Sequence, residues 1–285
     1  MKNIKYLLLI AITACGLTSC EVHSLSYAPE VPADDMAMFQ ITYVEPIAVN
    51  ANNAIDSVFI NGVLVDGATG AGQLTVNGTY PYGGSTITGT FFTTTPGMTN
   101  IKFYRKGNEV YNQDVDLKVG KQEVFVYKLT EKPIVLDNLY PYKGNPERAT
   151  IAEFGTDSIA RIRFYNFAFQ GNANTPYPGK IQYQWCHDKS VGVSGRGGAD
   201  GNWHNIGGPV GFGQATEYEI VGVWKEVFND TGYEQLWFRG IDEAGNVVIA
   251  NDYWTTQIGS TIKHIYRGVK GGSPAAGVTL SGLLR

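Results

Sequence analysis

Short runs of alternating polar and apolar residues, separated by turn residues, occupy most of the chain after residue 36. Such a period of two is typical of β-strands. The run QEVFVYKL at residues 122–129 alternates for eight positions, which predicts a strand that is buried on one face only. No stretch beyond the N-terminal leader keeps the 3.6-residue period of an amphipathic helix. We therefore expect an all-β fold.

Turn residues join several of these runs at hairpin spacing. Asn61-Gly62 separates DSVFI from VLVDG, and this dipeptide between two β-rich runs is a strong hairpin signal. Lys106-Gly107-Asn108 separates IKFYR from EVYNQDVDL in a similar way. Further strands are predicted at residues 158–169, 180–188, 216–228, 233–242, 246–254 and 260–268.

The strand pattern lapses between Lys132 and Asp157, where three prolines and two glycines occur. This composition is typical of a connection between domains. The pattern therefore predicts a first β-sandwich at residues 36–134, a linker at 135–157 and a second β-sandwich at 158–285.

Four segments carry a resemblance to a known family. Phe39–Val44 and Asp56–Gly62 resemble the opening R-x-R-F-x-N-A and the continuation V-D-V-Y-V-N-G of a tandem immunoglobulin-like domain of unknown function in bacterial surface proteins. Arg161–Phe167 resembles the same opening, and Tyr266–Gly268 resembles the closing strand.

The resemblance covers most of residues 36–130 and, more loosely, residues 158–285, because the second copy lacks the Asn-Gly hairpin and contains a glycine-rich segment. It implies two tandem immunoglobulin-like β-sandwiches in a Bacteroidetes-type envelope lipoprotein. The shared motifs form the fold, so the resemblance implies no catalytic residues.

The first residues, MKNIKYLLLIAITACGLTSC, indicate the destination of the protein. Two early lysines precede the apolar run 7–14, which is too short to span a bilayer. Residues 17–20 resemble a bacterial lipobox. We expect a signal peptide at 1–19, lipid on Cys20 and a tether over 20–35. The predicted location is the outer membrane, on its periplasmic or cell-surface face.

Charge and cysteine content argue against nucleic-acid binding and against an internal disulfide. The formal net charge of −4 gives no basic surface for nucleic acid. Cys15 leaves with the leader and Cys20 takes the lipid, so Cys186 is the only thiol expected in the mature protein. Stability must then come from core burial and not from a disulfide.

No catalytic motif is complete. Gly195–Asp200 begins like a dinucleotide-binding loop but ends in aspartate. Cys186 and His187 are neighbours in a predicted strand, so their side chains point to opposite faces and cannot act as nucleophile and base. Asp242-Glu243 lies in the turn sequence DEAGN, where aspartate and glycine are wanted for turn geometry. We expect no enzyme, no cofactor and no metal site.

Aromatic residues are the remaining signal, since all five tryptophans lie after residue 180. In YEQLWFRGI, Tyr233, Trp237 and Arg239 share one strand face. If Leu236 and Phe238 face the core, these three residues form an outward platform suited to a sugar or to a protein partner. The opposite assignment buries Trp237, and the sequence leaves both open.

The segment VGVSGRGGADGNWHNIGGPVGFG at residues 191–213 has glycine at nine of its 23 positions, which makes it a poor strand former. A large aromatic such as Trp203 has little reason to occur there unless it packs on something. Trp203 either fastens the segment to its own sandwich or faces a ligand, with Asp200, Asn202, His204 and Asn205 as polar neighbours. The third alternative is that the segment is disordered.

These observations favour a non-catalytic, membrane-anchored binding or adhesion lipoprotein of the cell envelope. The alternative is a surface lipoprotein that binds polysaccharide for glycan uptake. The candidate ligand-binding residues are Trp203, His204, Asn205, Tyr233, Trp237 and Arg239, and the expected partners are a glycan or an envelope or surface protein.

Overall fold

A computed structural model of the protein describes residues 35–46, 55–67, 91–137, 158–171, 175–189, 198–224, 233–271 and 278–280, all within one compact unit. Every regular element in these residues is a β-strand, which confirms the predicted all-β class. None of them belongs to a helix long and apolar enough to cross a bilayer. The predicted signal peptide, Cys20 and the tether up to residue 34 lie outside the described residues.

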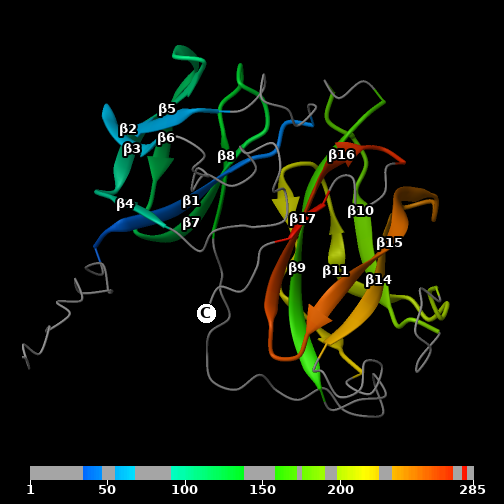
Figure 1. The fold of residues 1–285 in the computed structure, drawn as a ribbon. Coiled ribbons are helices and arrows are strands. Elements are labelled where there is room, and N and C mark those ends of the chain that lie inside the picture. The colour runs from blue at the N-terminus through cyan, green and yellow to red at the C-terminus, as the bar shows by residue number, and fades with distance from the viewer. Residues whose placement is uncertain are drawn as a thin grey trace, which may run out of the picture. The chain divides into compact units, whose positions relative to one another are not determined.

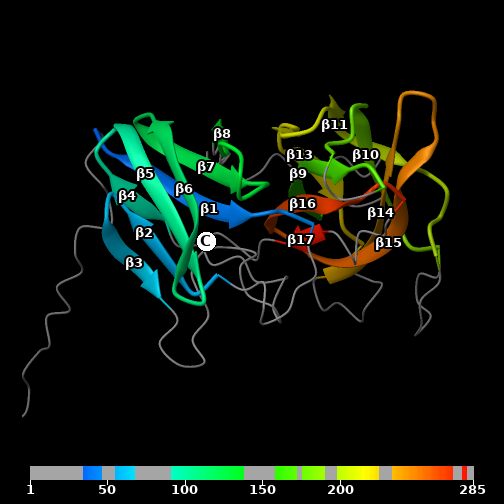
Figure 2. The same cartoon turned by 90° about the horizontal axis from the view of Figure 1, so that it is seen from above.

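The first group of strands forms two four-stranded sheets, which Figures 1 and 2 show as separate layers. One sheet has the order β4 (Phe92–Thr94), β1 (Ala37–Tyr43), β7 (Gly120–Val126) and β8 (Ile134–Asp137). The other has the order β3 (Val63–Gly67), β2 (Ser57–Ile60), β5 (Gly97–Arg105) and β6 (Asn108–Leu117). One hydrophobic core, which includes Phe39, Val58, Phe103 and Val124, joins the two sheets.

The second group repeats this arrangement. One sheet has the order β12 (Gln214–Ala215), β9 (Ile159–Phe169), β16 (Thr261–Val269) and β17 (Val278–Leu280), and β13 (Glu219–Gly222) also pairs with β9. The other has the order β11 (His204–Val210), β10 (Ile181–Cys186), β14 (Tyr233–Ile241) and β15 (Val247–Gln257). A second core, which includes Phe164, Tyr183, Trp185 and Phe238, joins them.

The two groups share one topology. In each, the first strand pairs in parallel with a late strand, β1 with β7 and β9 with β16. The Asn61-Gly62 turn joins β2 to β3, and the glycine-rich segment joins β10 to β11 at the equivalent place. Two tandem β-sandwiches therefore account for the sheets, as the sequence predicted.

Both predicted hairpins of the first sandwich are confirmed. Asn61 and Gly62 have φ of 50° and 79°, and Lys106 and Gly107 have φ of 51° and 73°. Two successive residues with positive φ form the turn whose twist matches that of the flanking strands. The pattern predicted no strand at the start of the linker, and this was wrong, because Ile134–Asp137 pairs with β7 as β8.

β7 is buried on both faces, so the prediction of a half-buried strand at 122–129 was wrong. Val124 faces the first core, whereas Phe125 lies in a third hydrophobic cluster with Tyr165, Phe167 and Ile265 of the second sandwich. The Phe125 and Phe167 ring centroids are 4.7 Å apart. A strand covered on both sides needs no polar face, and the polar residues of β7 therefore require partners in the interior.

Glu123 has such a partner. Its carboxylate forms an ion pair with the Nζ of Lys263 in β16, and both side chains are 3% exposed. Lys263 also donates to the Oε1 of Gln40 in β1, at 3.1 Å. This buried polar cluster, together with the third hydrophobic cluster, ties the β4-β1-β7-β8 sheet to the sheet that contains β9 and β16.

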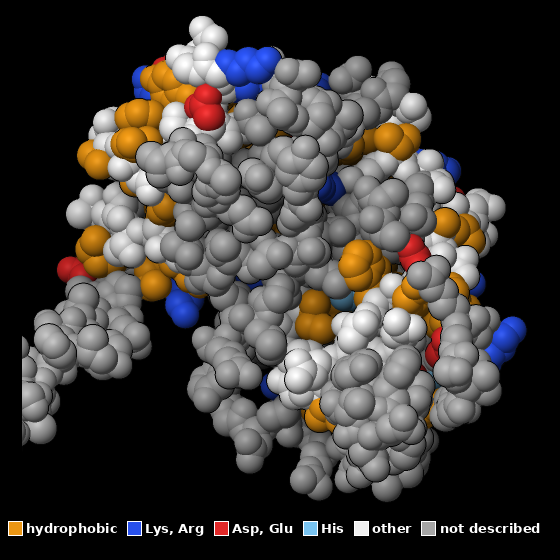
Figure 3. All heavy atoms as spheres, in the orientation of Figure 1, with side chains coloured by type: hydrophobic (Ala, Val, Ile, Leu, Met, Phe, Trp, Pro, Cys, Tyr) orange, Lys and Arg blue, Asp and Glu red, His pale blue; other side chains and the backbone are white. Residues whose placement is uncertain are grey.

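Hydrophobic side chains gather on the surface over β2, β3 and β4 in the space-filling view (Figure 3). β3 is the edge strand of its sheet, and Val63, Leu64 and Val65 expose 64%, 56% and 37% of their surface. Residues 68–90, which follow β3, lie outside the described residues.

Candidate functional site: an aromatic platform on the outer sheet

The outer face of the β11-β10-β14-β15 sheet carries the candidate site. Leu236 and Phe238 of β14 are fully buried in the second core, and the intervening Trp237 is half-buried. The open question about β14 is therefore settled in favour of an outward-facing Trp237. On β10, Tyr183 and Trp185 are buried in the core.

A row of polar side chains crosses three strands of this face. In the sheet register, Gln184 of β10 lies opposite Asn205 of β11 on one side and Arg239 of β14 on the other. The Arg239 Nε donates to the Gln184 Oε1 at 2.8 Å, and the Gln184 Nε2 donates to the Asn205 Oδ1 at 2.8 Å. Each side chain of the row fixes the orientation of its neighbour.

Trp203 covers one end of this row. The guanidinium carbon of Arg239 lies 4.2 Å from the centre of the Trp203 ring, which is the geometry of a cation–π contact. Trp203 precedes β11, so the start of that strand brings the indole over the sheet face. Trp203 fastens its segment to its own sandwich and remains half-buried.

A row of aromatic side chains lies beside the polar row. Trp237 is paired with Tyr253 of β15, and their ring centroids are 5.5 Å apart. The Trp237 Nε1 donates to the Oδ2 of Asp188 at 3.2 Å, which fixes the tilt of the indole. Together the two rows form what we call the aromatic platform: Gln184, Trp203, Asn205, Trp237, Arg239 and Tyr253.

The glycine-rich segment is not the strandless loop that its composition predicted. Its second half is β11, an edge strand paired with β10, which explains why Pro209 is tolerated there. Gly207 has φ of 58°, and a Cβ at this position would lie 2.9 Å from the Cβ of Thr216. Here glycine allows close packing and an unusual backbone angle. Residues 190–197 lie outside the described residues.

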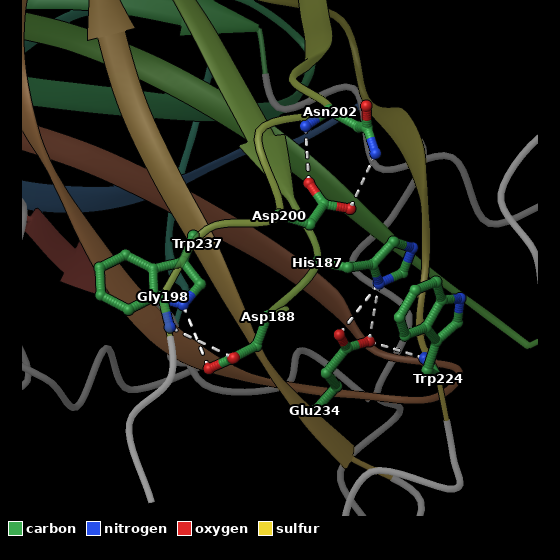
Figure 4. A network of polar contacts seen from close by, with 8 residues as sticks. All are labelled: His187, Asp188, Gly198, Asp200, Asn202, Trp224, Glu234 and Trp237. Carbon is green, nitrogen blue, oxygen red and sulfur yellow. Dashed lines mark hydrogen bonds and ion pairs between the residues drawn. The ribbon is translucent and has the colours of Figure 1, made fainter. Parts of the chain in front are cut away.

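The part of the segment just before Trp203 is held by hydrogen bonds, several of which are drawn in Figure 4. The Asp200 N–H donates to the His187 carbonyl at 2.9 Å. The Asn202 N–H donates to the Asp200 Oδ1 at 2.7 Å, and the Gly198 N–H donates to the Asp188 Oδ1 at 3.3 Å. These contacts place Trp203 on a fastened segment.

A buried polar cluster lies next to the platform (Figure 4). The Glu234 carboxylate is completely buried and lies 2.9 Å and 3.1 Å from the Nδ1 of His187. It also accepts the Trp224 N–H at 2.7 Å, and the His187 ring stacks on the Trp224 indole with centroids 3.8 Å apart. His187 directly precedes Asp188, which accepts the hydrogen bond from Trp237. The contacts of His187 with Glu234 therefore fix the backbone next to Asp188.

The structure brings together four of the six candidate residues: Trp203, Asn205, Trp237 and Arg239. His204 is not among them, since it stacks on Trp185 at 4.8 Å, across from β10 on the core side of the sheet. Tyr233 begins β14, and its backbone pairs with Gln257 of β15. Its side chain is not among those that the structure describes.

Sequence reasoning missed two members of the platform. Gln184 was not considered as a ligand-binding residue, because its importance comes from its neighbours on two other strands. Tyr253 directly precedes Trp254, which packs partly buried against the second core. Since successive residues of a strand point to opposite faces, a core-facing Trp254 would have assigned Tyr253 to the outer face.

Asp242 has a structural role in the turn between β14 and β15. Its Oδ1 accepts the N–H groups of Ala244 and Asn246 at 3.0 Å and 2.8 Å. Hydrogen bonding from Asn246 lowers the pKa of this carboxyl below its ordinary value. The turn interpretation of DEAGN is thus confirmed.

Cys186 is buried on the β10 face that the glycine-rich segment covers. Burial raises the pKa of its thiol to about 12, although the N–H groups of Gly201 and Asp200 oppose this shift. The reactive thiolate is therefore scarce near neutral pH.

We expect Cys186 in a protein of residues 21–285 to react with a thiol reagent such as Ellman's reagent on the order of a thousandfold more slowly than in the urea-unfolded chain, since the side chain is buried and its pKa is raised to about 12. The measurement is the labelling rate at pH 8. Rapid labelling of the folded protein would contradict the burial of this thiol.

The described residues contain no group of three or more histidine, cysteine, aspartate or glutamate side chains that could hold a metal ion. The carboxylates nearest to the platform are engaged with the protein itself. Asp188 holds Trp237 and Gly198, and Asp200 holds Asn202. The chemistry that the platform offers consists of aromatic faces, amide groups and one guanidinium.

Comparisons with known proteins add little. No family model matches the chain. No curated protein matches it. Among solved structures, it is similar to a DUF3823 family protein from Bacteroides ovatus ATCC 8483, with 9% identity and a TM-score of 0.19 over 79% of this chain and 96% of that one. A similarity this weak carries no conclusion about fold or function.

Proposed function

We propose that the protein is a non-catalytic binding lipoprotein of the bacterial cell envelope, and that its aromatic platform binds a carbohydrate. The observation that carries this proposal is the pairing of two rows on one sheet face. The Trp237–Tyr253 row offers ring surfaces, and the Asn205–Gln184–Arg239 row offers hydrogen-bonding groups beside them.

A sugar ring has an apolar C–H face and polar hydroxyl groups at its edge, so it matches such a surface in both respects. Binding sites typically combine aromatic surfaces with a few fixed polar groups. The platform side chains are held by the protein before a ligand arrives, which reduces the entropy lost on binding. The predicted lipid on Cys20 would anchor this binding surface to the outer membrane, on its periplasmic or cell-surface face.

The proposal predicts that a soluble protein of residues 21–285 is retarded by at least one polysaccharide in affinity electrophoresis. Trp237→Ala and Trp203→Ala should each weaken binding about tenfold or more, as is usual for central aromatic residues in a binding site. Circular dichroism spectra would verify that both variants fold.

Phe59→Ala is the matched control for these variants. Phe59 is half-buried on the outer face of the β3-β2-β5-β6 sheet, where its ring lies 5.1 Å from that of Tyr104. Loss of this ring should leave retardation unchanged. Equal losses in Phe59→Ala and Trp237→Ala, or no retardation by any polysaccharide of a broad panel, would contradict the proposal.

Adhesion to an envelope or surface protein is the second candidate. It is favoured by Val63, Leu64 and Val65, which are exposed on the edge strand β3. Unpaired strand edges are able to bind an extended segment of another chain. This function predicts that the native lipoprotein co-purifies with a protein partner and is not retarded by polysaccharides.

A further inference from the structure

Arg239 stands out on the platform because it is a partly buried cation that forms no ion pair with any described residue. Salt bridges between described residues join Lys102 to Glu109 and Lys263 to Glu123, and the His187 ring contacts Glu234, but none of these contacts includes Arg239. Partial burial lowers the pKa of the Arg239 guanidinium, yet an arginine keeps its charge at neutral pH. The protein thus holds a positive charge on its outer sheet face without a described anion beside it.

Two contacts fix the plane of this guanidinium. Its Nε donates to the Gln184 Oε1 at 2.8 Å, and the Trp203 ring covers one of its faces at 4.2 Å. Because Gln184 is itself held by Asn205, the whole row restrains the arginine side chain. The two terminal nitrogens form no hydrogen bond within the described residues.

The two nearby aspartates do not neutralise Arg239. Asp188 accepts hydrogen bonds from Trp237 and Gly198, and Asp200 accepts them from Asn202. Asp188 follows the C-terminal end of β10, where Cys186 pairs with Trp237 of β14, whereas Arg239 pairs with Gln184 two residues earlier in β10. A guanidinium with its two terminal nitrogens available presents a planar pair of donors that matches a carboxylate.

We propose that the carbohydrate bound by the platform is acidic, and that the terminal nitrogens of Arg239 bind the carboxylate of a uronic acid residue. This inference rests on the proposed carbohydrate-binding function. The ring of the charged sugar, or of its neighbour in the chain, would then lie against Trp237 and Tyr253.

The test compares each polysaccharide with its own uncharged form. Polygalacturonate, alginate and hyaluronate are each assayed against residues 21–285 beside a carboxyl-reduced preparation of the same polymer. The wild-type protein should bind at least one acidic polymer about tenfold to a hundredfold more tightly than its reduced form, as expected for a charge-assisted pair of hydrogen bonds. This preference should decrease as salt is added.

Arg239→Met should abolish the preference but retain the weaker binding to the reduced polymer, because the aromatic row is intact. Arg239→Lys should keep only part of the preference, since lysine lacks the planar donor pair. Arg161→Met is the control for loss of one positive charge, because Arg161 lies on β9 in a different sheet.

The outcomes separate the two proposals. Equal binding of acidic and reduced forms, binding of the reduced forms only, or a preference that survives in Arg239→Met would overturn the uronic acid assignment and leave carbohydrate binding standing. Binding of no polysaccharide at all would overturn both.

Discussion

Lys263→Met is expected to lower the free energy of unfolding by about 3–5 kcal/mol, the usual cost of removing one partner from a buried ion pair. The substitution leaves the Glu123 carboxylate, which is 3% exposed, without the ammonium group that lies against it. It also removes the hydrogen bond that the Lys263 ammonium group in β16 donates to Gln40 in β1. Urea unfolding of residues 21–285 at pH 7 measures the loss.

A double variant distinguishes the cost of an unpaired buried carboxylate from the cost of lost packing. Glu123→Leu combined with Lys263→Met should recover most of the stability, because a well-packed apolar pair replaces a buried ion pair at little cost. Lys102→Met provides the exposed control, since Lys102 pairs with Glu109 at 3.0 Å on the surface, and its loss should not be measurable. If Lys263→Met alone were as stable as the wild type, the Glu123–Lys263 pair would not hold the sheet of β1 and β7 to the sheet of β9 and β16.

Glu234→Ala is expected to cost about 3–5 kcal/mol as well, because it removes two buried hydrogen bonds to a carboxylate, each worth about 1.5–3 kcal/mol. Glu234 is completely buried and is the acceptor for both the His187 ring and the Trp224 N–H. Its removal leaves both groups in the interior without that acceptor, and each then incurs a desolvation penalty. Glu234→Gln keeps one acceptor oxygen and should lose less.

The matched control for Glu234→Ala is Gln235→Ala, the next residue of β14, which is half-buried on the opposite face. Its substitution should change the free energy of unfolding by less than about 0.5 kcal/mol, as is usual for surface positions. Thermal unfolding of both variants provides the comparison. Equal effects at positions 234 and 235 would contradict a structural role for the buried cluster.

Local sequence features predicted the strands well. Alternation found the main strands of both sandwiches, and Asn61-Gly62 marked a hairpin because two positive φ angles in succession need such residues. Alternation also placed Trp237 outward once Leu236 and Phe238 were taken as core.

Contacts between segments that are distant in the sequence could not be predicted from local sequence patterns. β11 has a composition that disfavours a strand, and it forms one because β10 offers an edge to pair with. The sequence of β7 gave no sign that its second face meets the second sandwich, so the role of Glu123 could not be predicted. His204 was assigned to the site from its closeness to Trp203 in sequence, but in the structure it lies on the opposite face of the sheet, against Trp185.

The candidate site shows the same division. The two tryptophans of the platform were predicted, because tryptophan among glycines or on an outward strand face is conspicuous, whereas Tyr253 was missed. Asn205 and Arg239 were predicted as well, but their alignment through Gln184 was not, since the three residues come from three strands and gain their arrangement only from the register of the sheet.

The most direct test of carbohydrate binding at the aromatic platform uses the five tryptophan indole N–H signals in a ¹H–¹⁵N NMR spectrum of residues 21–285. A retained polysaccharide is first cut to a short oligosaccharide and then titrated into the labelled protein. Carbohydrate binding at the platform should shift the Trp203 and Trp237 signals, while those of Trp185 and Trp254, which pack against the second core, stay in place. Binding that leaves Trp203 and Trp237 unshifted would contradict it.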